Sequence, residues 1–138
     1  MIWNKEKECI NREELRALQS QRLKQVVSRV YNNVPVYREK MQQAGVSPED
    51  IRSVDDLVRL PFTNKSDIRD NYPYGLFASP MEDIARIQGS SGTTGKLTIV
   101  GYTRHDLDVW AEVAARSLTC AGVNRKSIVQ VSYGYGLF

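Results

Sequence analysis

The chain has 138 residues, of which 41% are hydrophobic and 25% charged, and its formal net charge is +3, from 19 Lys and Arg against 16 Asp and Glu. This composition is typical of a globular domain in water. The basic residues are scattered among acidic ones, which argues against nucleic acid as a partner.

No stretch approaches the ~20 consecutive apolar residues that a membrane-spanning helix needs, and the N-terminal residues lack the apolar core of a signal peptide. Cys9 and Cys120 have neither metal-site spacing nor an obvious pairing, so we expect free thiols in a reducing compartment. The sequence therefore predicts a cytoplasmic protein without a membrane partner.

Residues 1–82 predict a helical N-terminal segment. Asn11, with Glu14 three residues later, is typical of a helix N-cap, and the apolar residues that follow keep to one half of a helical wheel to about residue 31. A shorter helix is expected after Pro35, ending at Gly45. Two further short helical turns are indicated by an N-cap residue with an aspartate three positions later: Ser53 with Asp56, and Asn64 with Asp67.

Residues 83–138 predict the beginning of an α/β core, because strand and helix patterns alternate there. Strands are expected over 84–89 and 97–102, and Thr103 with Asp106 predicts the start of a helix that Gly122 ends. One face of this helix carries an apolar stripe that should pack on the sheet: Leu107, Trp110, Ala111, Ala114 and Leu118. A further strand is expected over 127–133.

A run of glycines and hydroxyl residues separates the first two expected strands: Ser90, Ser91, Gly92, Thr93, Thr94, Gly95 and Lys96. Glycine permits positive φ, so consecutive N–H groups can face one concavity, while the hydroxyls add donors and Lys96 adds positive charge. These groups suit a polyphosphate, although such clusters are often plain loops. Because Ser90 and Leu97 stand where a P-loop needs glycine and a hydroxyl, this would be a different nucleotide-binding class.

The segment from Gly89 to Lys96 followed by TIVGYT resembles the phosphate loop of the adenylate-forming acyl-CoA synthetases. Four other stretches resemble their phenylacetate-CoA ligase branch and follow in the expected order: 34–46, 60–67, 72–73 and 133–138. The resemblance implies an α/β AMP-binding domain with a helical N-terminal lead-in and a phosphate loop at 89–96. It also implies a ligase that uses ATP, Mg²⁺ and coenzyme A to convert an aryl acid such as phenylacetate first to an acyl-adenylate and then to a thioester.

Residue roles follow from the same resemblance. The loop residues from Ser90 to Lys96 would hold the β- and γ-phosphates of ATP, while Tyr133 and Phe138 would line an aryl-acid pocket, unless they are ordinary packing residues. Most of the superfamily has Pro at the position of Leu97, so the exit of the loop should be less pre-organised here. His105, at a helix start, is expected to be exposed and solvated rather than to act as a general base.

Proteins of the resembled branch are about three times longer, and a strand pattern close to Phe138 suggests a fold that continues. We therefore expect an N-terminal fragment of a ligase that is inactive alone, and possible homodimers of the intact enzyme. The first alternative is a non-catalytic remnant or split half that binds a partner carrying the rest of the fold. The second is an adenylating enzyme that uses an acceptor other than coenzyme A.

Overall fold

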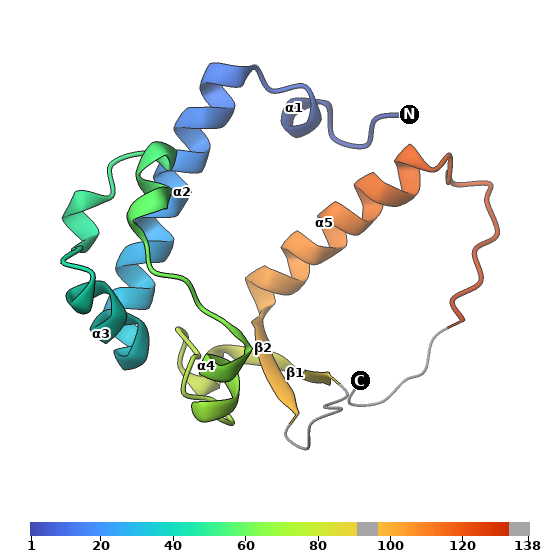
Figure 1. Cartoon of the computed structure of the whole chain (residues 1–138). Helices are drawn as coiled ribbons and strands as arrows, with labels where there is room; N and C mark the ends of the chain where they lie inside the picture. Colours follow the sequence, from blue (N-terminus) through green and yellow to red (C-terminus); the bar gives the residue numbers. More distant parts are fainter. Residues whose placement is uncertain (91–96, 133–138) are drawn as a thin grey trace.

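The computed structural model describes residues 1–90 and 97–132, in which helices precede a two-stranded antiparallel hairpin and a long helix (Figure 1). The elements are α1 (Lys5–Glu8), α2 (Arg12–Asn33), α3 (Pro35–Gln43), η1 (Pro48–Asp50), η2 (Val54–Arg59), α4 (Lys65–Asp70), η3 (Met81–Asp83), β1 (Ile84–Ser90), β2 (Thr98–Thr103) and α5 (Arg104–Cys120). The expected α/β class with a helical beginning is confirmed.

A small core joins α2 to α3 and to the short turns that follow. Its buried members come from four different parts of the helical segment: Val27, Met41, Val46 and Ile51. Tyr37 packs against this core and its hydroxyl donates to the Pro61 carbonyl over 3.1 Å. Burial of these apolar side chains is the main favourable contribution to folding of the segment.

Local capping sets where most of these helices begin. The Asn11 side chain accepts the Glu14 N–H at 2.9 Å, so α2 begins where the sequence predicts. At three other helix starts, the aspartate three positions later accepts a hydrogen bond from the N–H of the N-cap residue: Asp56 from Ser53, Asp67 from Asn64 and Asp106 from Thr103. Gly45 follows α3 with φ of 65° and Gly122 follows α5 with φ of 95°, the left-handed conformation that suits glycine after a helix.

An ion pair links α3 to α4. Lys40 Nζ donates to Asp67 Oδ2 at 2.7 Å and to the Phe62 carbonyl at 3.2 Å, and the Asn64 N–H donates to the same carboxylate at 2.7 Å. Lys40, followed by the Asn64 N–H, holds the pKa of Asp67 below its usual range. Segment 60–67, which carries part of the family resemblance, is therefore held against α3 at two points. These are the Phe62 carbonyl and the Asp67 carboxylate, and both bind Lys40.

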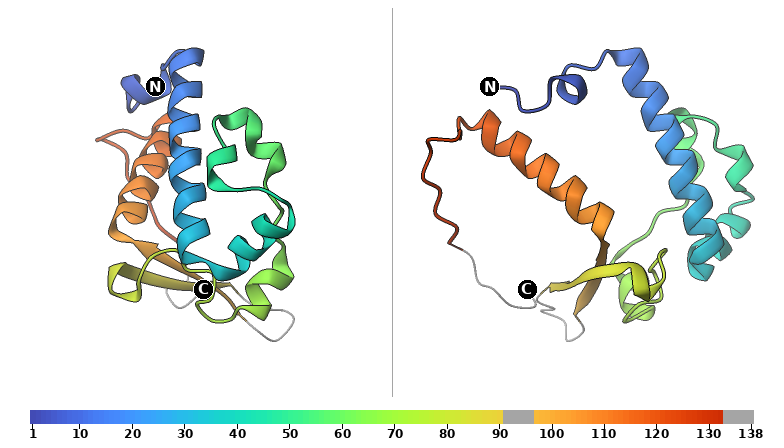
Figure 2. Two further views of the ribbon diagram at one scale, coloured as in Figure 1. Left: turned by 90° about the vertical axis from the view of Figure 1, so that its left-hand side faces the viewer. Right: turned by 180° about the vertical axis from the view of Figure 1, so that it is seen from behind.

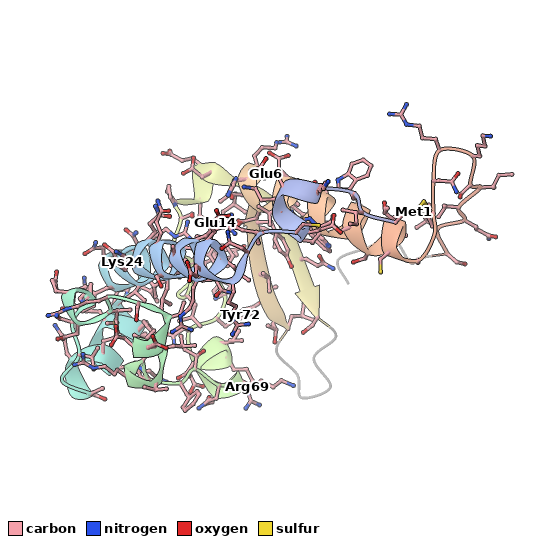
Figure 3. The ribbon with its side chains drawn as sticks, turned by 90° about the horizontal axis from the view of Figure 1, so that it is seen from above. Met1, Glu6, Glu14, Lys24, Arg69 and Tyr72 are labelled. Carbon is pink, nitrogen blue, oxygen red and sulfur yellow. The ribbon has the colours of Figure 1, made fainter. Side chains whose placement is uncertain are left out.

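The hairpin lies beside α4, and α5 rises from the end of β2, well apart from α2 (Figures 1 and 2). Near the middle of α5, Glu112 connects this helix to the N-terminal residues. Trp3 Nε1–H donates to Glu112 Oε2 at 2.9 Å, while Asn4 Nδ2 and Arg116 Nη2 each donate to Oε1 at 2.8 Å. Figure 3 shows the segment from Met1 to Glu6 along α5; the sequence did not indicate this contact or helix α1.

Two expectations for the C-terminal half differ from the structure. Residues 127–132 are not in a strand, and Ile128 is fully exposed, because no described segment lies alongside to pair with this backbone. The apolar stripe of α5 is only partly covered: Leu107 and Ala114 are half-buried, whereas Trp110, Ala111 and Leu118 are exposed. Helical spacing predicts which residues lie on the same face of a helix. Whether that face is buried depends on another element that packs against it.

Met41 is fully buried, so Met41→Ala removes packing at the centre of the core. We expect a loss of roughly 2–5 kcal/mol in the free energy of unfolding, measured by urea unfolding followed by circular dichroism. Val58→Ala, at a residue that is 89% exposed, is the control. Its urea midpoint should equal that of the unsubstituted chain within error. Equal effects of the two substitutions would contradict the described core.

Glu112 should make attachment of the N-terminal segment depend on pH. Arg116, then Trp3 and Asn4, hold the pKa of Glu112 below its usual range, so the ionised carboxylate favours the attached state. This contribution is complete above the unfolded pKa of about 4.3 and is lost as the pH falls through the lower folded value. The Trp3 indole N–H resonance should therefore move toward its free position on acidification.

In Glu112→Gln the same resonance should show no such acid transition, whereas Glu13→Gln, at an exposed position of α2, should retain it. A transition that persists in Glu112→Gln would show that another group controls attachment.

Candidate functional site: a hairpin that ends at the glycine-hydroxyl loop

The hairpin brings the two ends of the glycine-hydroxyl loop together. β1 and β2 pair in an antiparallel register that places Ser90 opposite Thr98 and Gly89 opposite Ile99, and Gly89 is buried. An irregularity in the register lies between Ile84 and Arg86, at the opposite end of the hairpin. Paired strands thus fix the positions at which the chain enters and leaves the loop.

Of the residues predicted to bind phosphate, Ser90 lies in the described structure, as the exposed last residue of β1. The other six lie outside the described residues: Ser91, Gly92, Thr93, Thr94, Gly95 and Lys96. Both residues predicted to line the aryl-acid pocket, Tyr133 and Phe138, also lie outside them. Leu97, which stands at the exit of the loop, is half-buried, and His105 is exposed as expected.

Helix α5 begins at the other end of β2, away from the loop. Five residue steps separate Thr98 from Thr103, which is roughly 17 Å along an extended strand. One of the first N–H groups of α5, that of Asp106, already donates to the Thr103 hydroxyl. A phosphate at the loop would therefore depend on the loop's own donors and not on a helix N-terminus.

One face of the hairpin rests on the segment after α4. A Cβ atom built on Gly101 would lie 2.6 Å from Phe77 Cε2 and 3.2 Å from Ile84 Cδ1, so glycine allows the β2 backbone to approach the Phe77 ring. Phe77 in turn contacts Tyr74, with ring centroids 5.2 Å apart. Glycine within an expected strand was the sequence signal for this close approach, and its partner could not be named without the fold.

Next to this contact lies a hollow of about 310 Å³ whose walls include Ile68, Phe77, Ile99 and Thr98. It is mainly apolar, and Thr98 places it near the exit of the loop. A larger cleft of about 760 Å³ lies between α2 and α5, and among the described residues neither Ser90 nor Thr98 lines it. The hollow under the hairpin is therefore the cavity that lies nearer to the motif.

The other face of the hairpin carries an aromatic cluster. The rings of Tyr102 and Trp110 lie 5.2 Å apart at an angle of 35°, and the Arg86 guanidinium lies 5.5 Å from the centre of a Trp110 ring. Together, these contacts fix the first turns of α5 against β2 and β1. Trp110 therefore packs on the hairpin with part of its ring, although 42% of the residue stays exposed.

A carboxylate lies in the helix cap at the junction of β2 and α5. The backbone N–H and then the hydroxyl of Thr103 hold the pKa of Asp106 below its usual range, with a further contribution from Arg29 of α2.

Within residues 1–90 and 97–132, no three His, Cys, Asp or Glu side chains gather as a metal site. None of the helices in this part is both long and apolar enough to cross a bilayer.

Curated relatives match between 90% and 100% of the chain. A phenylacetate-coenzyme A ligase of Thermus thermophilus is 54% identical over 138 residues, which are 100% of this chain and 31% of that protein. Over the matched residues this chain is homologous to phenylacetate-coenzyme A ligases. The Escherichia coli phenylacetate-coenzyme A ligase is 56% identical over 126 residues, 91% of this chain and 29% of that protein. The chain corresponds to an N-terminal part of these family members and spans about 30% of their length.

Solved structures support the same relationship. An open conformation of 2-hydroxyisobutyryl-CoA ligase in complex with 2-HIB-AMP and CoA matches 89% of this chain and 29% of that one, with a TM-score of 0.78 and 28% identity. The same ligase in its thioesterification state matches 83% of this chain and 25% of that one, with a TM-score of 0.75 and 30% identity. No protein-family model matches the chain.

Gly101→Ala tests the close approach of β2 to Phe77. The added methyl group would overlap the ring, so we expect a loss of about 1–3 kcal/mol in the free energy of unfolding, measured by denaturant titration. In a Phe77→Ala background the same substitution should have a clearly smaller effect, because the clashing ring is gone. Additive effects would mean that this contact does not hold the hairpin.

Proposed function

We propose that the chain is the phosphate-binding N-terminal part of an ATP-dependent phenylacetate or related aryl-acid CoA ligase. The observation that carries this proposal is the 54% identity with the Thermus thermophilus phenylacetate-coenzyme A ligase over all 138 residues. The hairpin adds a physical reason, since its paired ends at Ser90 and Thr98 give the glycine-hydroxyl loop a fixed base.

In the proposed reaction a carboxylate oxygen of the acid attacks the α-phosphorus of ATP. An acyl-adenylate forms and pyrophosphate leaves with additional negative charge. The role of the loop from Ser90 to Lys96 is to hold the β- and γ-phosphates with N–H and O–H donors. Such donors stabilise the departing pyrophosphate most when its charge is greatest, so they lower the barrier rather than only tightening ATP binding.

The acyl group then passes to the thiol of coenzyme A and AMP is released. The solved 2-hydroxyisobutyryl-CoA ligase complexes, which contain 2-HIB-AMP and CoA, support both steps for this fold. Within the proposal, Tyr133 and Phe138 line the aryl-acid pocket. Mg²⁺, a cytoplasmic location and a homodimeric assembly are further predictions from the family relationship.

The experiment is a chimera in which this chain replaces the matching residues of the Thermus thermophilus ligase. We expect the chimera to form phenylacetyl-CoA with release of AMP and pyrophosphate, and the 138-residue chain alone to form none. Thr93→Ala or Thr94→Ala in the chimera should each lower kcat by about 100-fold, the low end of the effect of removing one fixed donor.

Thr119→Ala, at the far end of α5, is the matched control and should retain the activity of the chimera. Unchanged kcat in the Thr93 and Thr94 variants would overturn the role of the loop. A chimera that folds but releases no pyrophosphate with any aryl acid would overturn the function. Pyrophosphate release without thioester formation would instead favour an adenylating enzyme with another acceptor.

A further inference from the structure

The Phe77 ring is held by its own segment of the chain. The Phe77 N–H donates to the Tyr74 carbonyl at 2.9 Å, and the two rings lie 5.2 Å apart at an angle of 52°. A tilted pair of rings at this separation is a favourable aromatic contact. The position of the Phe77 side chain therefore depends on residues that precede the hairpin in the chain.

Hydrogen bonds connect this segment to α4. The Gly75 N–H donates to the Asn71 carbonyl at 2.9 Å, and Asn71 Nδ2 donates to the Asp67 carbonyl at 2.8 Å. A Cβ atom built on Gly75 would lie 2.8 Å from the Asn71 carbonyl oxygen, so glycine allows this turn to close. The Asp67 carboxylate is paired with Lys40 of α3. A continuous set of contacts therefore runs from α3 to Phe77, and all of these residues lie outside the hairpin.

The atoms of Phe77 that meet the hairpin are at the far end of its ring. The Cβ position of Gly101 would lie 2.6 Å from Cε2 and 2.7 Å from Cζ, so these two carbons face the β2 backbone. Thr98 is three residues from Gly101, which is roughly 10 Å along a strand. A tilt of the hairpin by about 6° at Gly101 would therefore move Thr98, and Ser90 opposite it, by about 1 Å.

We propose that Phe77 is a positioning residue for the adenylation step. Through Gly101 it holds Ser90 and Thr98, the two ends of the glycine-hydroxyl loop, where the loop can bind the departing pyrophosphate. Phe77 needs no contact with ATP for this role. A displacement of about 1 Å in groups that bind the reacting atoms can lower a rate roughly 100-fold. The inference rests on the proposed function, which gives the loop its phosphate-binding role.

The test compares Phe77→Leu with Phe77→Met in the chimera. The two replacements are similar in volume and apolar character. The methionine side chain reaches an ε carbon, as the phenylalanine ring does, whereas the leucine side chain ends at its δ carbons. We expect kcat for pyrophosphate release to fall about tenfold or more in Phe77→Leu, and to stay close to that of the unsubstituted chimera in Phe77→Met.

The kinetic constants separate positioning from stability. KM for ATP should change less than kcat in Phe77→Leu, because the loop donors act mainly on the charge that develops as pyrophosphate leaves. Met41→Ala, which weakens the α2–α3 core, is the control for stability and should retain kcat in the folded chimera. Equal kcat in Phe77→Leu and Phe77→Met would overturn the inference, because the ring would then contribute only apolar volume.

A readout without turnover is the Gly101 Hα resonance of the 138-residue chain. We expect the ring current of Phe77 to shift this resonance, and the shift to disappear in Phe77→Leu. An unshifted resonance would overturn the inference and leave the proposed function standing, as would equal kcat in the two variants. An unsubstituted chimera that folds but releases no pyrophosphate would overturn the function and this inference with it.

Discussion

The close contact between the Gly101 backbone and the Phe77 ring determines where the hairpin lies relative to the helical segment. β1 continues directly from η3, and β2 leads directly into α5 through the Thr103 cap. Movement of β2 away from Phe77 would therefore displace α5 and both ends of the glycine-hydroxyl loop together. The small residue at this position is thus a structural requirement for the placement of the hairpin.

Much of the helical segment could be predicted because its signals are local. Asn11 and Asn64 cap helices through bonds to residues two or three positions later, and Gly45 adopts the conformation that ends a helix. The hairpin was also predictable, since two short strand patterns flank a turn-forming run. The resemblance in that run is confirmed by phenylacetate-coenzyme A ligases that are 51–56% identical to this chain.

The remaining features depend on partners distant in the sequence. Residues 127–132 have a strand composition, but a strand needs a neighbour, and the stripe of α5 could not reveal how much of it would be covered. The hydrogen bond from Trp3 to Glu112 joins residues 109 positions apart, and neither residue carries a pattern that would indicate the other. The chemical roles of Thr93, Thr94 and Tyr133 stay predictions, since these residues lie outside the described part.

The same separation in sequence has a consequence for the order of folding. The caps and the α2–α3 core join residues that are close along the chain, so their loop-closure entropy is small and they can form early. Attachment of Trp3 to Glu112 closes almost the whole described chain and becomes favourable only after α5 is in place. The N-terminal segment should therefore be the last part to fold and the first to detach. The free energy of this local detachment should be well below that of global unfolding.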